Sequence, residues 1–198
     1  DVYKRQSVLD AARQAQLEQC LARRFDTRVT GFVSEACNGG VTNGYDRPGQ
    51  LGVDRWLAMI GAAELVGGDC IVIDAGSAIT LDLLRADGHH LGGAILPGIN
   101  TSLQRFRRIF SHIDFDDPRI DQIDRPGGST EAAIQIDYPR DSIDRLRELV
   151  NDWIQNLDQD ASVLLAGGDA PSLQSRLERQ GRIVPDLVFL GMRKLAEQ

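Results

Sequence analysis

An acidic and a basic residue stand side by side where a predicted helix begins, directly behind a glycine. The stretch from Tyr45 to Trp56 places Asp54 next to Arg55, with Gly52 just before them. A glycine lets a ligand approach the backbone closely, and an acid–base pair at a helix mouth can take part in proton transfer and charge stabilisation. The simpler interpretation stays open: Asp54 complements the helix dipole, and Arg55 is an ordinary surface charge.

A second candidate follows a short hydrophobic strand, where Asp74 precedes a turn of small residues up to Thr80. Backbone N–H groups and the Ser77 hydroxyl in such a turn can face phosphate oxygens. Asp74 could hold a cation beside them, because hard cations favour oxygen ligands. A tight turn that needs small residues, with Asp74 capping it, explains the same pattern equally well.

Two further glycine pairs precede predicted helices. Gly167-Gly168-Asp169 lies between a buried strand and a helix, a place where nucleotides commonly bind, although a plain loop is the commoner explanation. Gly127-Gly128-Ser129 leads to Thr130, whose hydroxyl could bind a small substrate or simply cap the helix. Neither pair decides a function alone.

Other reactive residues carry less weight. His89 and His90 are adjacent on a predicted strand, so they point to opposite faces and cannot form a simple ligand pair. A cluster of arginines (Arg105, Arg107 and Arg108) is interpreted as a solvated helix face. The sequence has no serine-hydrolase, P-loop or dinucleotide-binding glycine signature, so those three enzyme classes are poor candidates.

The elements that must position these residues alternate between helical and strand periodicity, which predicts a mixed α/β fold. Helices are expected at residues 7–21, 54–66, 101–110, 130–157 (with a break at 138–139) and 187–197. A further helix is expected to begin at Pro171. Expected strands cover residues 28–34, 70–73, 79–84, 90–96, 162–166 and 183–184, and residues 38–52 form a glycine-rich loop.

Composition narrows the class of protein. The 198 residues carry 22 basic and 29 acidic side chains, a net charge of −7, which argues against nucleic-acid binding. Three cysteines without a CxxC spacing argue against a disulfide framework and favour the cytoplasm. The best apolar run, residues 56–63, is too short to span a membrane, and no signal-peptide pattern opens the chain.

Taken in order, these stretches resemble the type III pantothenate kinases of the acetate and sugar kinase/Hsp70/actin superfamily. The resemblance extends from about Val29 to the end of the chain. Five segments carry it: Leu51-Gly52-Val53-Asp54-Arg55-Trp56, Asp74-Ala75-Gly76-Ser77-Ala78-Ile79-Thr80, His90-Leu91-Gly92-Gly93-Ala94-Ile95-Leu96-Pro97-Gly98, Gly167-Gly168-Asp169-Ala170 and Pro185-Asp186-Leu187-Val188-Phe189-Leu190-Gly191.

The resemblance implies an activity and a role for each matching residue. Members of this family use ATP with Mg²⁺ and a monovalent cation (K⁺ or NH₄⁺) to convert pantothenate to 4'-phosphopantothenate, the first step of coenzyme A biosynthesis. Asp54 matches the proton acceptor and Arg55 its catalytic neighbour. The remaining matches are Tyr45, Gly52, Val53 and Thr130 for pantothenate, Asp74 for the cation, and Gly76, Ser77, Gly167 and Gly168 for ATP. Ser77 stands where the family usually has threonine, so the hydroxyl is kept.

The resemblance also implies the architecture: two ribonuclease-H-like α/β domains, here expected at residues 1–68 and 69–198, with the helix at 186–198 packing back on the first. The family's N-terminal Asp-x-Gly-Asn-Thr phosphate segment has no counterpart, so the first domain is expected to be incomplete and the chain poorly active. A homodimer in the cytoplasm is expected, without nucleic-acid or membrane partners. The alternatives are a non-catalytic regulatory or accessory relative, or a kinase of the same superfamily with another small substrate.

Overall fold

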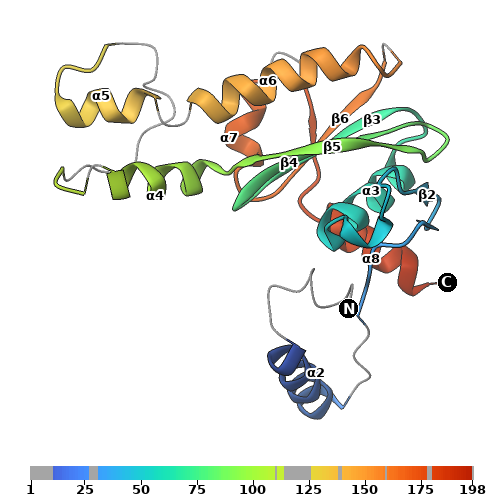
Figure 1. The fold of residues 1–198 in the computed structure, drawn as a ribbon. Coiled ribbons are helices and arrows are strands. Elements are labelled where there is room, and N and C mark those ends of the chain that lie inside the picture. The colour runs from blue at the N-terminus through green and yellow to red at the C-terminus, as the bar shows by residue number, and fades with distance from the viewer. Residues whose placement is uncertain are drawn as a thin grey trace.

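The computed structural model describes residues 11–26, 31–109, 111–113, 126–137, 140–158, 160–177 and 180–197 (Figure 1). Their central feature is a five-stranded sheet with the order β5-β4-β3-β6-β7. The strands are β3 (Cys70–Ala75), β4 (Ala78–Leu84), β5 (His90–Pro97), β6 (Ser162–Ala166) and β7 (Arg182–Ile183). The helices are α2 (Ala11–Phe25), α3 (Val53–Leu65), α4 (Ile99–Ile109), α5 (Thr130–Asp137), α6 (Arg140–Ile154), α7 (Ala170–Gln174) and α8 (Leu187–Ala196).

The sheet combines two kinds of strand pairing. Strands β3, β4 and β5 form an antiparallel meander, whereas β6 and β7 run parallel to β3. Parallel pairing sets Asp74 opposite Ala166, so the carboxyl ends of β3 and β6 lie at one edge of the sheet. The turns that follow these two strands therefore meet at that edge, which is where ligands bind in open α/β sheets.

Helices cover both faces of the sheet, as Figure 1 shows. On one face α6 and α7 supply apolar side chains such as Leu146 and Leu173, which pack against Ile71 and Ile73 of β3. On the other face α3 packs Trp56 and Met59 into a second core. Because β3 is covered on both sides, its residues 70–73 form a continuous apolar run, as is typical of a buried central strand.

Helix α8 packs directly against α3 through two glycines. A β-carbon at Gly61 of α3 would clash with the backbone carbonyl of Leu187, and one at Gly191 of α8 would clash with the carbonyl of Leu57. Side chains at these positions would force the helices apart, so small residues permit the close approach. The contact between α8 and α3 therefore depends on glycine at both positions, while the division into two domains, with the final helix packing back on the first, stays a prediction.

Most predicted elements are confirmed, including the meander and both helices that flank residues 138–139. The predicted strand at 28–34 is wrong in its described part, residues 31–34, where the chain forms no strand. Instead the Ser34 hydroxyl donates a hydrogen bond to the carbonyl of Leu51 at 2.9 Å, which ties this segment to the following loop. Residues 1–10, with the predicted cap Ser7, lie outside the described residues.

The segment predicted as one loop, residues 38–52, contains short ordered elements. A hairpin pairs β1 (Cys37–Asn38) with β2 (Val41–Thr42), and a 3₁₀ turn, η1, covers Pro48–Gln50. Positive φ angles at Gly39 and Gly40 build the tight hairpin turn. In the part of the chain that the structure describes, no helix has the length and apolar character needed to cross a membrane.

Candidate active site

The loop before α3 is held in place by the side chain of Asn43. Its amide nitrogen donates to the carbonyls of Glu35 at 3.1 Å and Pro48 at 3.2 Å, and its oxygen accepts the N–H of Tyr45 at 3.0 Å. Buried Asn43 therefore satisfies backbone groups on both sides of the loop. This scaffold fixes where the chain enters α3 and hence where the acid–arginine pair lies.

Asp54 and Arg55 share the first turn of α3 but face different surroundings. Asp54 is exposed, and its Oδ1 accepts the backbone N–H of Arg55 at 2.9 Å. A carboxylate in this position is favoured by the positive end of the helix dipole. Arg55, by contrast, is only 5 % exposed, so the alternative that it is a plain surface charge is wrong.

Buried Arg55 is paired with Asp82 of β4. Its Nε donates to Oδ2 at 2.8 Å and its Nη2 to Oδ1 at 2.6 Å. This bidentate ion pair fixes the plane of the guanidinium. A third donor, Nη1, reaches the hydroxyl oxygen of Tyr45 at 2.9 Å. Burial alone would lower the pKa of Arg55, but its hydrogen bonds to Asp82 and Tyr45 raise it, so the side chain stays charged.

His90 completes this polar cluster. Its Nε2 lies 2.9 Å from Oδ1 of Asp82, while its Nδ1 lies 3.4 Å from the backbone N–H of Gly44. Because Nδ1 accepts the hydrogen bond from the N–H of Gly44, Nε2 carries the hydrogen and donates to Asp82. The ring also stacks on Tyr45 with 5.8 Å between centroids. His89 is exposed and His90 fully buried, as expected for neighbours on a strand.

Asp74 lies at the carboxyl edge of the sheet, against the turn that follows β6. Gly167 adopts φ +88°, and a β-carbon there would come within 2.6 Å of Oδ1 of Asp74. Partial burial, followed by the negative charge of Asp54, raises the pKa of Asp74. A cation beside Asp74 would relieve both effects.

The predicted phosphate-binding residues gather at the same edge. Gly76 and Ser77 form the β3–β4 turn, and the exposed Ser77 accepts a hydrogen bond from Thr101 at its backbone carbonyl, at 2.6 Å. Gly167 and Gly168 form the turn after the neighbouring parallel strand. The structure thus brings these four residues together with Asp74.

Thr130 is placed elsewhere. It begins α5, which Figure 1 shows at the far end of the molecule from α3, and its side chain is exposed. The helix is capped by Ser129, whose hydroxyl accepts the N–H of Ala132 at 3.2 Å, so the interpretation of Thr130 as the cap is wrong. Within this chain Thr130 does not join the other predicted substrate residues, and its role stays a prediction.

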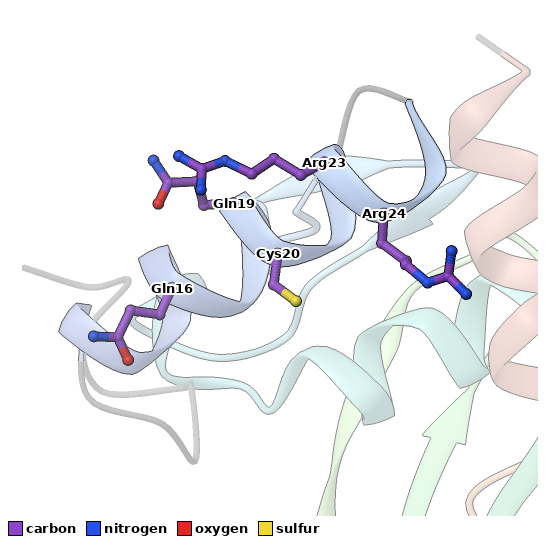
Figure 2. A pocket seen from close by; sticks show the side chains of 5 residues that line it. All are labelled: Gln16, Gln19, Cys20, Arg23 and Arg24. Atoms are coloured by element: carbon purple, nitrogen blue, oxygen red, sulfur yellow. The ribbon is translucent and has the colours of Figure 1, made fainter.

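Two hollows of the surface lie apart from these residues. Figure 2 shows one of about 470 Å³ along the exposed helix α2, lined by Gln16, Gln19, Cys20, Arg23 and Arg24. A second, of about 560 Å³, lies between β4, β5 and the end of α6, beside Leu83 and Trp153. Neither includes a predicted site residue. Among the described residues no group of three or more His, Cys, Asp or Glu side chains is arranged to hold a metal ion.

Sequence reasoning missed Asp82 and dismissed His90. The available signal was a charged residue in the apolar run Leu81-Asp82-Leu83-Leu84, because a buried carboxylate needs a partner. A second signal was Gly93, which lies opposite Asp82 in the antiparallel pair. A β-carbon at Gly93 would meet the guanidinium of Arg55 and Oδ1 of Asp82, so glycine leaves room for the ion pair.

Comparison with known proteins identifies the family. The family model described as type III pantothenate kinase matches residues 6–140, more than half of the chain. The chain belongs to the type III pantothenate kinase family. That match includes Asp54, Arg55, Asp74, Ser77 and Thr130, whereas Gly167 and Gly168 lie beyond it.

Individual type III pantothenate kinases support the assignment over a longer stretch. The protein from Azotobacter vinelandii is 35% identical over 186 residues, which are 90% of this chain and 72% of the relative. The protein from Pseudomonas putida strain F1 is 39% identical over 163 residues, 77% of this chain and 62% of that relative. The chain therefore spans about two thirds of the length of these kinases.

A solved structure extends the similarity to the fold. The crystal structure of a Baf family protein from Campylobacter jejuni has a TM-score of 0.52 and 27% sequence identity, and covers 80% of this chain and 69% of that chain. The mixed α/β fold of this chain is therefore similar to that of this solved structure.

Proposed function

We propose that this protein transfers a phosphoryl group from ATP to the primary hydroxyl of pantothenate, forming phosphopantothenate at the start of coenzyme A biosynthesis. Family membership supports the reaction class. The observation that carries the proposal is the glycine-lined edge of the sheet, where the Gly167 turn lies against Oδ1 of Asp74. The charge of Asp54, at the start of α3, helps to raise the pKa of Asp74, so an acceptor hydroxyl held by Asp54 and a phosphate chain at this edge could meet between them.

Asp54 acts as the proton acceptor in this proposal. Phosphoryl transfer passes through a loose transition state, so the enzyme contributes mainly positioning and charge stabilisation. The exposed carboxylate needs only to orient the hydroxyl and take its proton late, for which an ordinary carboxylate is basic enough. Its hydrogen bond from the N–H of Arg55 holds one oxygen and leaves the other for the substrate.

Arg55, Tyr45 and the backbone of Gly52 and Val53 bind pantothenate. Within the described residues, three of the five N–H donors of Arg55 bind Asp82 and Tyr45, and two are left for substrate oxygens. The guanidinium lies 5.6 Å from the centre of the Tyr45 ring, so the two side chains form one surface. Such a surface suits an acid that carries several oxygens.

The edge of the sheet binds ATP and the cation. Turn glycines Gly76, Gly167 and Gly168 and the Ser77 hydroxyl would face the phosphates, which arrive with Mg²⁺. Asp74 fits a monovalent cation, because its half-buried carboxylate stands near a second negative charge. Bound there, K⁺ or NH₄⁺ would neutralise part of the phosphate charge.

The finer architecture belongs to the same proposal. Two ribonuclease-H-like domains, residues 1–68 and 69–198, would form a homodimer in the cytoplasm. The packing of α8 on α3 through Gly61 and Gly191 supports an element that bridges the two domains. Thr130 is retained as a substrate residue on the strength of the sequence resemblance alone.

A coupled ADP-release assay with pantothenate, ATP, Mg²⁺ and K⁺ tests the proposal. It is run on the protein expressed from its full reading frame and on its Asp54→Asn variant. Loss of a general base lowers kcat by about 100- to 10,000-fold, whereas Asp46→Asn, an exposed residue of the same loop, leaves it unchanged. Pantothenate binding without ADP release would favour the accessory-protein alternative instead.

A further inference from the structure

The buried cluster around Arg55 contains two residues that the proposed chemistry does not use. Asp82 is 1 % exposed and His90 is fully buried, and neither reaches the exposed carboxylate of Asp54 through a hydrogen bond in the described structure. Both instead contact groups that do bind substrate in the proposed function. A role for Asp82 and His90 therefore rests on the proposed function, and these two residues lie one contact further from the substrate than Arg55 and Tyr45.

Burial of this ion pair needs an explanation beyond stability. Removing two charges from water costs several kcal/mol each, and apolar residues of similar volume often serve a core as well or better. The pair nevertheless interrupts the apolar face formed by Val72 and Leu84. Asp82 orients the side chain of Arg55. Its two carboxylate oxygens accept hydrogen bonds from Nε and Nη2, which fixes both the plane and the rotation of the guanidinium.

His90 connects this anchor to the substrate loop. It donates to Oδ1 of Asp82, accepts the N–H of Gly44 and stacks on Tyr45, so one ring contacts the strand β4 and the loop before α3. A β-carbon at Gly44 would clash with the carbonyl of His90, which shows how closely the loop approaches β5. Displacement of the ring would release the Tyr45 phenol and one hydrogen bond of Asp82 together.

We propose that Asp82 and His90 are positioning residues, which hold the guanidinium of Arg55 and the phenol of Tyr45 in the orientation that binds the acid substrate. Asp82 sets the Arg55 plane, and His90 sets Asp82 and Tyr45. Neither touches the reacting atoms. Their loss weakens binding of the hydroxy acid and leaves the nucleotide edge of the sheet, on β3 and β6, unaffected.

Titration calorimetry of the protein from the full reading frame, with pantothenate and ATP measured separately, tests this proposal. The variants are Asp82→Asn, which removes the charge, and His90→Phe, which keeps an aromatic ring but removes both hydrogen bonds. We expect the Kd for pantothenate to rise about 10- to 100-fold, as for a misplaced binding group, and the Kd for ATP to stay within about twofold. The steady-state KM for pantothenate follows its Kd.

Two control variants change an exposed histidine and an exposed aspartate near the buried cluster. His89→Phe changes the exposed neighbour of His90, and Asp87→Asn changes an exposed carboxylate in the β4–β5 turn. Both should bind pantothenate as the unaltered protein does. His90→Gln, which can still donate to Asp82, should recover part of the affinity lost in His90→Phe, and a thermal melt of every variant verifies folding.

A double-mutant comparison tests the route through Arg55. If Asp82 acts through this side chain, Asp82→Asn added to Arg55→Ala changes the Kd for pantothenate by less than about threefold, because coupled changes are not additive. Variants that melt lower yet bind pantothenate normally would overturn the positioning role and make the cluster structural. An unaltered protein that fails to bind pantothenate would instead overturn the proposed function, and this inference with it.

Discussion

The contact between α3 and α8 can be tested by adding one methyl group. In Gly191→Ala the new carbon would lie well inside 3.0 Å of the Leu57 carbonyl oxygen, a distance that real β-carbons essentially never show. The obstacle is helical backbone and not the end of a flexible side chain, so a rotamer change cannot relieve it. We expect α8 to move away from α3, which opens the core that contains Trp56 and Leu187.

The size of the effect follows from two opposing terms. Alanine is favoured over glycine inside a helix by about 1 kcal/mol, which alone would stabilise the variant. Overpacking of a close contact costs about 1–3 kcal/mol, and a backbone obstacle places this case at the upper end. The free energy of unfolding should therefore fall by about 2 kcal/mol, which lowers the urea midpoint by about 1 M.

Urea unfolding followed by circular dichroism measures this change. Gly67→Ala is the matched control, because Gly67 is exposed, lies just beyond α3 and has open space where its β-carbon would be. That variant should keep or gain up to about 1 kcal/mol, since alanine restricts the unfolded chain. A Gly191→Ala midpoint equal to or above that of the unaltered protein, with the same slope, would refute the argument.

Three further predictions concern single groups. Folding raises the pKa of Asp74, so its ionised form destabilises the native state as the pH rises above about 4. Asp74→Asn should therefore raise the melting temperature at neutral pH but not below pH 4. Added K⁺ should narrow the difference in melting temperature between the two proteins. Burial, with the charge of Asp69, raises the pKa of Cys70 to about 12, so a thiol reagent at pH 8 should modify Cys70 only after unfolding. Gly167→Ala, at φ +88° against Asp74, should raise the KM for ATP at least tenfold, whereas Gly68→Ala, an exposed glycine before β3 with open space at its β-carbon, should change it less than twofold.

Local patterns predicted most of the fold. The buried strand that begins at Cys70 and the strand at 162–166 are apolar runs in the sequence, and the Tyr138-Pro139 pair predicts the end of one helix before the next, so each element is visible in its own residues. The hairpin at 37–42 was missed, because two-residue strands carry no periodicity. The strand expected near Ser34 failed because tertiary hydrogen bonding to Leu51 decides that segment, and alternation of residues does not report it.

The parts of the candidate site that could be predicted are those formed by residues adjacent in the sequence. Asp54 with Arg55, and Asp74 with its small-residue turn, are short motifs that a resemblance can locate. The partners of Arg55 lie 27 and 10 positions away, at Asp82 and Tyr45, and only the pairing of strands brings them together. Burial of Arg55 could not be inferred either, because an arginine in a first helical turn is usually exposed.

Mass spectrometry of the reaction product shows whether this protein phosphorylates pantothenate. The protein from the full reading frame is incubated with pantothenate, ATP, Mg²⁺ and K⁺, and pantothenate is examined for a phosphoryl group on its primary hydroxyl. We expect phosphopantothenate to accumulate at the same rate as ADP, and almost none to form with Asp54→Asn. Consumption of ATP without phosphorylated pantothenate, or an Asp54→Asn variant that forms product at the unaltered rate, would contradict the role assigned to the start of α3.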